Sequence, residues 1–361
     1  MENLVGRQVG QYEIESLIGR GGMATVYRAR QLSVERDVAI KVITERYEPE
    51  SPFMQRFMQE VRIIARLENP HILPIYDFGH IDQHPYLVMR YLDGGSLNGL
   101  INRRRLELQE IERLIIQICA ALDYAHEQNV VHRDMKPHNV LLDRQGNAYI
   151  CDFGIAKIIG GDHALTRTGE AVGTPSYMAP EQWQGLSVDR QADVYAVGAM
   201  LYEMLTGDAP FESDNIFSLM YKHLNELPPR IAPRRPELPP ALDMVIAQAM
   251  AKLPADRFAS AGEMARAVSL ALRGPTIPQG RAAPETRRLR TPGADEMAET
   301  DVIGLTRDDD LDVRRDIGLD APVAAGRAWA LNAFLEWLDD PDASPILFIV
   351  GPHGIGKSTL A

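Results

Sequence analysis

A polar segment of eight residues, HRDMKPHN at positions 132–139, constrains this chain more than any other feature. It follows a long run with helical apolar periodicity and precedes the strand-like run VLL. Within it lie Asp134, Lys136 and Asn139. An aspartate in such a loop can accept a hydroxyl proton, a lysine can neutralise a phosphoryl group, and an asparagine carbonyl can hold a cation. For any one of these residues alone, a polar turn with Asp134 as a capping group and His132 as a core histidine is the better interpretation.

Two further motifs follow in order and disfavour that alternative. DFG begins at Asp152, thirteen residues after Asn139 and behind the strand-like run NAYIC. APE, Ala179 to Glu181, follows a loop rich in Thr and Gly. Each motif lies on the strand, loop or helix that its chemistry requires. The ordered set therefore predicts a phosphoryl-transfer site.

The glycine-rich turn IGRGGMATV, residues 18–26, is a weaker signal by itself. A β-hairpin that needs positive φ is one interpretation of its glycines. The other is a loop without side chains whose backbone N–H groups approach phosphate oxygens.

The strand-like run VAIK ends at Lys41, fifteen residues past Val26. Only six of the 38 basic residues are lysine, which disfavours a lysine placed merely to face solvent. A helix carrying Glu60 follows, and Lys41 paired with Glu60 could hold the α- and β-phosphates. Glu45 and Glu68 are competing acids, but they lie near the ends of that helix.

Helical and strand periodicities divide the chain. Residues 12 to about 90 contain short β-rich runs and one helix over 52–67, whose apolar stripe is Phe53, Phe57, Val61 and Ile64. Residues 96–272 are mostly helical, and one long helix is predicted to end at Gly207.

From about Tyr12 to Leu272 the chain resembles bacterial eukaryotic-like Ser/Thr protein kinases, on the motifs quoted above. The resemblance implies an α+β, bilobal fold: a small antiparallel β lobe with one main helix, and a large mostly helical lobe. ATP would lie in the cleft between them. The third glycine of the usual phosphate lid is Ala24, as in the GGMA common among bacterial members.

The resemblance also assigns roles to individual residues. Asp134 would be the catalytic base, assisted by Lys136, with Lys41 paired to Glu60, and Asn139 and Asp152 would bind Mg²⁺. Glu181 would pair with Arg257. Met89 would be the gatekeeper, followed by a hinge from Arg90 to Leu92. The expected ATP ligands are Ile18, Gly19, Gly21, Gly22, Val26, Ala39, Lys41, Met89, Arg90, Leu92 and Leu141.

Activation is expected to involve the loop between Asp152 and Glu181. In the kinases that this chain resembles, the arginine before the catalytic aspartate is a buried cation that needs an anion from the activation loop, and Arg133 has that position. Thr166 and Thr168 lie eight and six residues before Thr174, the spacing of autophosphorylated threonines in similar bacterial kinases. A phosphate on either could bond Arg133 and Lys157. The alternative is that Glu170 already supplies the charge.

Composition bounds the remaining possibilities. A length of 361 residues predicts about two domains, and 45% hydrophobic with 24% charged residues is ordinary for a globular protein. The net charge of −12 argues against a general nucleic-acid binder. No signal peptide or membrane span is expected. Two cysteines indicate a reducing compartment, and hence a cytoplasmic protein.

Three regions are expected: a kinase domain at 12–272, a flexible linker at 273–322, and the start of a P-loop NTPase at 323–361. GPHGIGKS follows the strand candidate ILFIV and matches the phosphate-binding P-loop, with Gly351, Gly356, Lys357 and Ser358 as nucleotide ligands. The preceding GRAWALNAFLEWL resembles the helix that leads into NACHT- or AAA-like signalling NTPases, with Ala328 replacing the usual acid. This α/β segment is incomplete, so the sequence is expected to be a fragment of a larger protein.

The leading hypothesis is a Mg²⁺- and ATP-dependent protein Ser/Thr kinase. Its partners would be proteins with Ser or Thr hydroxyls and the kinase itself, by autophosphorylation. The alternative is a pseudokinase scaffold that regulates a C-terminal NTPase. The presence of Lys41, Glu60, Asp134, Asn139 and Asp152 argues against the scaffold.

Overall fold

The computed structural model describes residues 3–48, 50–154, 175–273, 303–306 and 346–349. The chain divides into two compact units, residues 1–277 and 278–361. Several expectations lie outside the described residues: the phosphosites Thr166 and Thr168, the helix over 326–338, and the P-loop residues Gly351, Gly356, Lys357 and Ser358.

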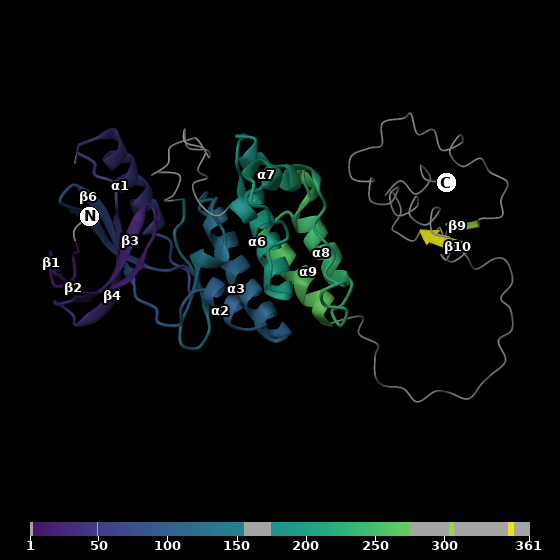
Figure 1. The fold of residues 1–361 in the computed structure, drawn as a ribbon, viewed down its shortest axis with the longest axis horizontal. Helices are drawn as coiled ribbons and strands as arrows, with labels where there is room; N and C mark the ends of the chain where they lie inside the picture. The colour runs from purple at the N-terminus through teal and green to yellow at the C-terminus, as the bar shows by residue number, and fades with distance from the viewer. Residues whose placement is uncertain (1–2, 49, 155–174, 274–302, 307–345, 350–361) are drawn as a thin grey trace. The chain divides into compact units, whose positions relative to one another are not determined.

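The N-terminal part of the first unit is one antiparallel sheet (Figure 1). Its strand order is β1-β2-β3-β4-β6-β5. Its strands are β1 (Gln8–Val9), β2 (Tyr12–Arg20), β3 (Ala24–Gln31), β4 (Arg36–Ile43), β5 (Ile75–Ile81) and β6 (His84–Arg90).

The register of this sheet gathers the expected nucleotide ligands on one face. Ala39 and Lys41 are two residues apart on β4 and therefore lie on the same face. Val26 of β3 pairs with Lys41, and Met89 of β6 pairs with Ala39. Four predicted ligands thus share a face, although they come from three strands.

One helix, α1 (Pro52–Ile64), packs on the sheet. Ser51 caps it by accepting a hydrogen bond from the backbone N–H of Met54 at 3.2 Å, and Pro52 occupies the first turn, where no N–H is needed. The buried stripe is Met54, Phe57, Val61 and Ile64. The predicted helix is confirmed, with its end three residues before Leu67.

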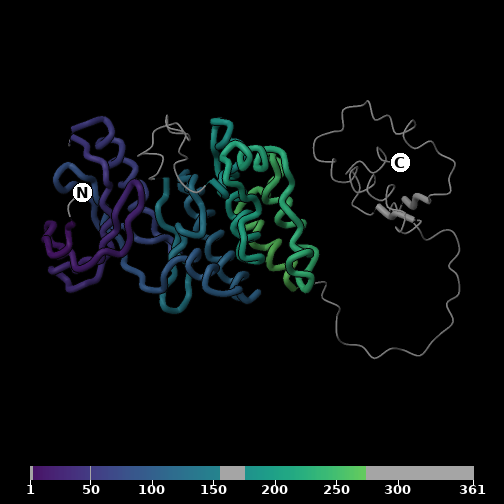
Figure 2. The backbone as a smooth tube through the Cα atoms, in the orientation of Figure 1, coloured from purple at the N-terminus to yellow at the C-terminus, as the bar shows by residue number. Residues whose placement is uncertain are grey.

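The remainder of the first unit is mostly helical (Figures 1 and 2). Its helices are α2 (Leu97–Arg103), α3 (Leu108–Glu127), α5 (Pro180–Trp183), α6 (Arg190–Thr206), α7 (Ile216–Asn225), α8 (Ala241–Ala249) and α9 (Ala261–Arg273). Short 3₁₀ turns lie at Pro137–Asn139, Pro175–Tyr177 and Pro254–Asp256. Helix α6 is buried almost all round and ends, as predicted, at Gly207, whose φ of 95° only glycine adopts readily.

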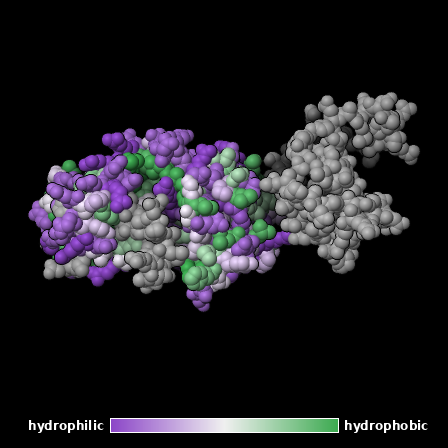
Figure 3. Space-filling view, turned by 90° about the horizontal axis from the view of Figure 1, so that it is seen from above, coloured by the Kyte–Doolittle hydropathy of each residue, from purple (hydrophilic) through white to green (hydrophobic). Residues whose placement is uncertain are grey.

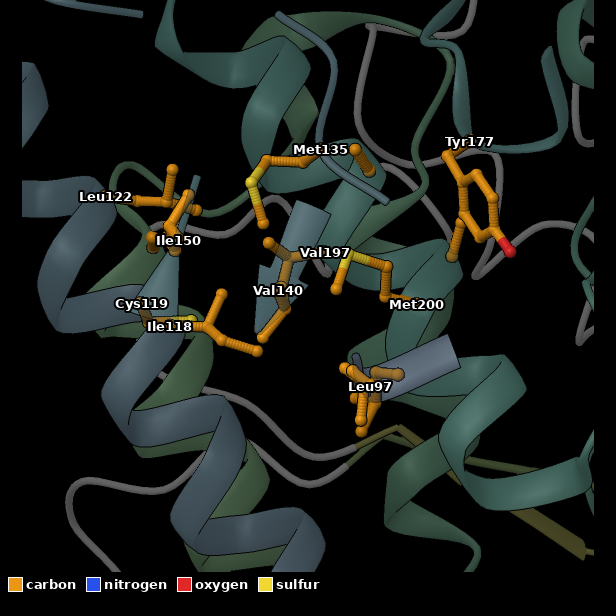
Figure 4. Close-up of a cluster of buried hydrophobic side chains, with 14 of the residues drawn as sticks. Leu97, Ile118, Cys119, Leu122, Met135, Val140, Ile150, Tyr177, Val197 and Met200 are labelled. Atoms are coloured by element: carbon orange, nitrogen blue, oxygen red, sulfur yellow. The ribbon is translucent and has the colours of Figure 1, made fainter. Parts of the chain in front are cut away.

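A two-stranded hairpin, β7 (Val140–Leu142) with β8 (Ala148–Ile150), follows the HRDMKPHN loop. Met135 of the loop and Val140 and Ile150 of the hairpin lie among apolar side chains of α3 and α6 (Figure 4). The polar loop is therefore seated on the hydrophobic core of the helical part.

The second unit contains an antiparallel pair, β9 (Ile303–Thr306) and β10 (Ile346–Ile349). β10 confirms the strand predicted from ILFIV. β9 falls inside the stretch that composition assigned to the linker, where a run of four residues is too short to give a periodic signal. The proposed boundaries at 273 and 322 stay predictions.

The surface of the described residues is polar for the most part. Viewed from above, hydrophilic residues cover most of it, with smaller apolar groups between them (Figure 3). No helix in the described part of the chain is long and apolar enough to cross a membrane.

Candidate active site

A carboxylate from α6 holds the backbone of the HRDMKPHN loop. Asp193, only 1% exposed, accepts hydrogen bonds from the backbone N–H groups of His132 and Arg133, both at 2.8 Å. His126 Nε2 lies 2.7 Å from the same carboxylate. Burying a carboxylate is costly unless its oxygens are bonded. These contacts satisfy Asp193 and fix the turn that precedes Asp134.

The carboxylate of Asp134 is oriented by two neighbours. Its Oδ2 accepts from Lys136 Nζ at 2.7 Å and from Asn139 Nδ2 at 3.0 Å. Asn139 Nδ2 also donates to the Asp134 carbonyl at 2.7 Å. No described residue bonds to Oδ1, which leaves this oxygen to accept a proton from a substrate hydroxyl.

Lys41 reaches the DFG motif, with its Nζ 2.8 Å from Asp152 Oδ1. Burial opposes ionisation of both groups, but the opposite charge outweighs it. The pKa of Lys41 is therefore raised above its ordinary value, and the pKa of Asp152 is lowered below its own. Both groups are charged at neutral pH.

Glu60 does not join this pair. Its side chain is exposed on α1 and makes no ion pair with any residue that the structure describes. The expected Lys41–Glu60 contact is therefore absent from this structure, and Asp152 takes the lysine instead. Lys41 bonds whichever of the two acids, Glu60 or Asp152, the packing of the fold places within reach. The sequence does not determine how α1 is rotated, and therefore does not determine where Glu60 lies.

His132 links the catalytic loop to the DFG motif. Its Nε2 donates to the Cys151 carbonyl at 2.9 Å, and its Nδ1 accepts from the backbone N–H of Asp134 at 3.3 Å. The Phe153 ring packs against it, with ring centroids 4.6 Å apart. His132 is completely buried and therefore packs as a core histidine. Its two ring nitrogens also link Asp134 to Cys151 by hydrogen bonds.

The chemistry of Asn139 and Asp152 fits a divalent cation. The backbone N–H of Cys151 donates to the backbone carbonyl of Asn139 at 2.9 Å, which joins the 3₁₀ turn that carries Asn139 to the segment just before Asp152. Because Asn139 Nδ2 is committed to Asp134, its amide oxygen is available. Carboxylate and amide oxygens suit Mg²⁺, which keeps other positions for water and phosphates.

The glycine-rich turn connects β2 and β3. Gly19, Gly21 and Gly22 all lie outside the left-handed region. A Cβ added at Gly19 or Gly22 would meet no atom within 4 Å, and at Gly21 it would lie 3.6 Å from the Ala24 carbonyl oxygen, an ordinary contact. The hairpin backbone does not require these glycines, so the positive-φ interpretation is wrong.

The expected adenine site has mixed exposure. Ala39 and Met89 are 7% and 8% exposed, Val26, Leu92 and Leu141 are half-buried, and Ile18 is exposed. Arg90 donates its backbone N–H to the Pro74 carbonyl at 3.1 Å. Its guanidinium bonds the Tyr149 hydroxyl at 3.3 Å. The N–H of this hinge residue is thus already used within the fold.

The predicted pair in the helical part is present. Arg257 bonds both carboxylate oxygens of Glu181 at 2.7 Å, and both side chains are buried. This bidentate pair fixes α5 against the loop that precedes α9.

Two site residues escaped the sequence analysis. Neither Asp193 nor Gln182 belongs to a motif that the sequence identifies. An acid in the first turn of an otherwise apolar helix was the available signal for Asp193. No spacing rule reports a contact with His132 across 61 positions.

The comparisons with known proteins decide the family. The protein kinase domain family matches residues 12–267. This chain belongs to the protein kinase family. Among similar curated kinases, Mycobacterium tuberculosis (strain H37Rv) PknH is 42% identical over 275 residues, which are 76% of this chain and 44% of that protein. PknD of the same strain is 44% identical over 270 residues, 74% of this chain and 40% of that protein.

Solved structures of the family agree with the fold. The crystal structure of the M. tuberculosis PknI kinase domain aligns with a TM-score of 0.59 at 30% identity. The match covers 73% of this chain and 98% of that domain. The match spans less than half the length of PknH and of PknD, so the likeness concerns their kinase domains.

Proposed function

We propose that this chain is a protein Ser/Thr kinase that transfers the γ-phosphoryl group of ATP to Ser or Thr hydroxyls, including those of its own activation loop. One observation carries the proposal. Asp134 has one carboxylate oxygen held by Lys136 and Asn139 and the other without a partner among the described residues. The curated relatives PknH and PknD are named as serine/threonine-protein kinases.

The residues divide the work as follows. Asp134 Oδ1 accepts the hydrogen of the attacking hydroxyl and orients its oxygen. Lys136, 2.7 Å from the other oxygen of the same carboxylate, offsets negative charge at the transferring group. Mg²⁺, when bound by Asn139 and Asp152, would neutralise phosphate charge.

The nucleotide would lie against the sheet face that carries Val26, Ala39, Lys41 and Met89. The glycines of the β2–β3 turn support this placement, because nothing within the described fold demands them. Lys41 would exchange part of its contact with Asp152 for the α- and β-phosphates, and Glu60 would support it after a shift of α1.

The alternative function is a pseudokinase scaffold that regulates a C-terminal NTPase. The P-loop of that NTPase would bind nucleotide through Gly351, Gly356, Lys357 and Ser358. A cytoplasmic location is proposed from the two free cysteines, Cys119 and Cys151.

Phosphotransfer by purified protein tests the proposal. Wild type should incorporate radiolabelled phosphate into itself and into a generic protein substrate. Asp134→Asn should lose at least about a hundredfold in rate, because the general base is removed while the shape is kept. Lys41→Met should lose activity with an unchanged fold, because Lys41 positions phosphates. Asp256→Asn, a change of an exposed aspartate in a 3₁₀ turn, is the matched control.

The alternative makes the opposite prediction. If neither wild type nor Asp134→Asn transfers phosphate, the scaffold is favoured. Wild-type turnover by Asp134→Asn would overturn the assignment of the base.

A further inference from the structure

Gln182, in the short helix α5, bridges two segments that lie 49 positions apart. Its Oε1 accepts the backbone N–H of Ala179 at 3.0 Å. Its Nε2 donates to the carbonyl oxygen of Arg133 at 2.8 Å. The single side-chain amide thus joins the end of the activation segment to the catalytic loop.

The carbonyl that Gln182 holds belongs to the peptide immediately before Asp134. Arg133 has a φ of 65°, a left-handed conformation that costs free energy for a residue with a side chain. Such a conformation persists only where the surroundings hold it. Here Asp193 holds the N–H of Arg133 at 2.8 Å, and Gln182 holds its C=O. The N–H of Asp134 is bonded to His132, so both ends of the 133–134 peptide are fixed.

The helical turn that carries Gln182 is fixed in place by the residues on either side of it. Its neighbour Glu181 forms the buried bidentate pair with Arg257, at 2.7 Å for both bonds. The other neighbour, Trp183, is 9% exposed. The backbone of Gln182 is therefore fixed by both neighbours, and a residue that positions another group needs such support.

We propose that Gln182 is a positioning residue for phosphotransfer: it orients the peptide that precedes Asp134 and couples the catalytic carboxylate to the segment from Tyr177 to Glu181. This inference rests on the proposed kinase function. Gln182 acts through the Arg133 carbonyl and touches neither nucleotide nor reacting atoms. Loss of order in the activation segment would reach Asp134 through this bond.

The expected size of the effect follows from the surroundings. A cavity of about 20 Å³ lies between the catalytic loop and the activation segment, lined by Asp134, Tyr177, Gln182 and Asp193 among others. This is close to the room that one water needs. Truncation of Gln182 would let water reach the Arg133 carbonyl and replace part of the lost bond. We therefore expect Gln182→Ala to lower kcat about five- to twentyfold, the range for one imperfectly replaced hydrogen bond. The KM for ATP should change less than about twofold.

Gln182→Glu separates positioning from packing. Glutamate keeps the shape and can still accept from Ala179, but when ionised it presents an acceptor to the Arg133 carbonyl. When protonated it regains a donor. The kcat of Gln182→Glu should therefore rise relative to that of Gln182→Ala as the pH falls from about 8 to about 5.5, towards the ordinary range of a glutamate pKa. A merely structural side chain would give no such relative change.

Gln184→Ala is the matched control, since Gln184 has an exposed side chain two positions along the same turn. It should leave kcat, KM and the pH profile as in wild type. A kcat for Gln182→Ala within twofold of wild type, or the same pH profile for both Gln182 variants, would overturn the proposal.

Amide hydrogen exchange of the nucleotide-free protein gives a readout that does not need catalysis. Gln182→Ala should speed exchange in the peptide covering 132–139 at least about threefold, whereas Gln184→Ala should not. Unchanged exchange in that peptide contradicts the inference. If wild type transfers no phosphate, the kinase proposal fails, and this exchange measurement still decides whether Gln182 holds the loop.

Discussion

At the scale of the residue, the molecule keeps several ionisable groups away from water and matches each to a partner. Lys41 and Asp152 balance each other at 2.8 Å. Asp193 is bonded by three donors at once. His223 is different: it is wholly buried, its Nδ1 lies 2.8 Å from the Tyr195 hydroxyl, and its Nε2 has no partner among the described residues.

His223 should make the fold sensitive to acid. Burial, with a smaller contribution from the Lys252 charge, lowers the pKa of His223 to about 3, against an ordinary value near 6.5. Between these values the unfolded chain binds a proton that the folded one does not. The contribution of His223 to the free energy of unfolding is fully present above about pH 6.5. It is lost as the pH falls, by up to about 1.4 kcal/mol per pH unit.

We expect His223→Phe to remove this component. The phenyl ring keeps the contacts with Phe211 and Trp183, whose centroids lie 5.0 and 6.2 Å from the imidazole. Denaturant unfolding at several values between pH 7.5 and 5 should show a shallower fall in unfolding free energy for the variant. Carboxylates titrate in both proteins and cancel in the comparison. Parallel curves would contradict the assignment of His223.

At the scale of the element, the placement of α1 accounts for the absence of the expected Lys41–Glu60 pair from this structure. α1 buries Met54, Phe57, Val61 and Ile64, and with this packing Glu60 faces solvent. The stripe predicted the helix, but it did not predict its rotation relative to Lys41. The rotation of α1 depends on how the helix packs against the rest of the protein, and the spacing of its apolar residues carries no information on that packing.

We expect phosphorylation of the activation segment to increase the rate of phosphotransfer. The expectation that Arg133 is a buried cation is wrong, since its side chain is exposed beside Asp134, the proposed base. The purified kinase should carry phosphate on Thr166 or Thr168, because a phosphate can reach this exposed guanidinium. A phosphate there adds about −1.5 to −2 charges and one or more charge-assisted hydrogen bonds. Thr166→Ala combined with Thr168→Ala should be about tenfold slower, the equivalent of one such bond. Mass spectrometry that finds neither threonine modified in an active enzyme would favour Glu170 as the anion.

The sequence predicted most of the first unit for a definable reason. Motifs such as HRDMKPHN carry their chemistry within a few residues, so Asp134, Lys136 and Asn139 were found together, as the structure shows. Contacts across long separations were found only where the family resemblance supplied them, as for Glu181 with Arg257. Asp193 and Gln182 act on backbone groups, and a sequence gives no sign of which peptide group will need a partner.

At the scale of the whole molecule, the two units differ in what they contain. The first has a continuous hydrophobic core beneath the catalytic loop. The second shows one antiparallel strand pair among its described residues. The last helix of the first unit, α9, buries Met264, Ala265, Val268 and Ala271 and packs on α3. Arg273, its final residue, lies 3.6 Å from Glu112 of α3.

A chain that ends at Arg273 should therefore fold and phosphorylate a generic substrate at a rate within about twofold of the full chain. Among the residues that the structure describes, the buried core of the first unit ends at Ala271 in α9, which closes that core. A chain that ends at Ser260 is the control: it loses α9, exposes the α3 face beneath it, and should aggregate or melt well below the longer chain, because each large buried side chain removed costs about 1.5–3 kcal/mol. Thermal melting and phosphotransfer of the three chains test this. Aggregation of the chain that ends at Arg273, beside a soluble full chain, would show that the kinase domain depends on residues beyond α9.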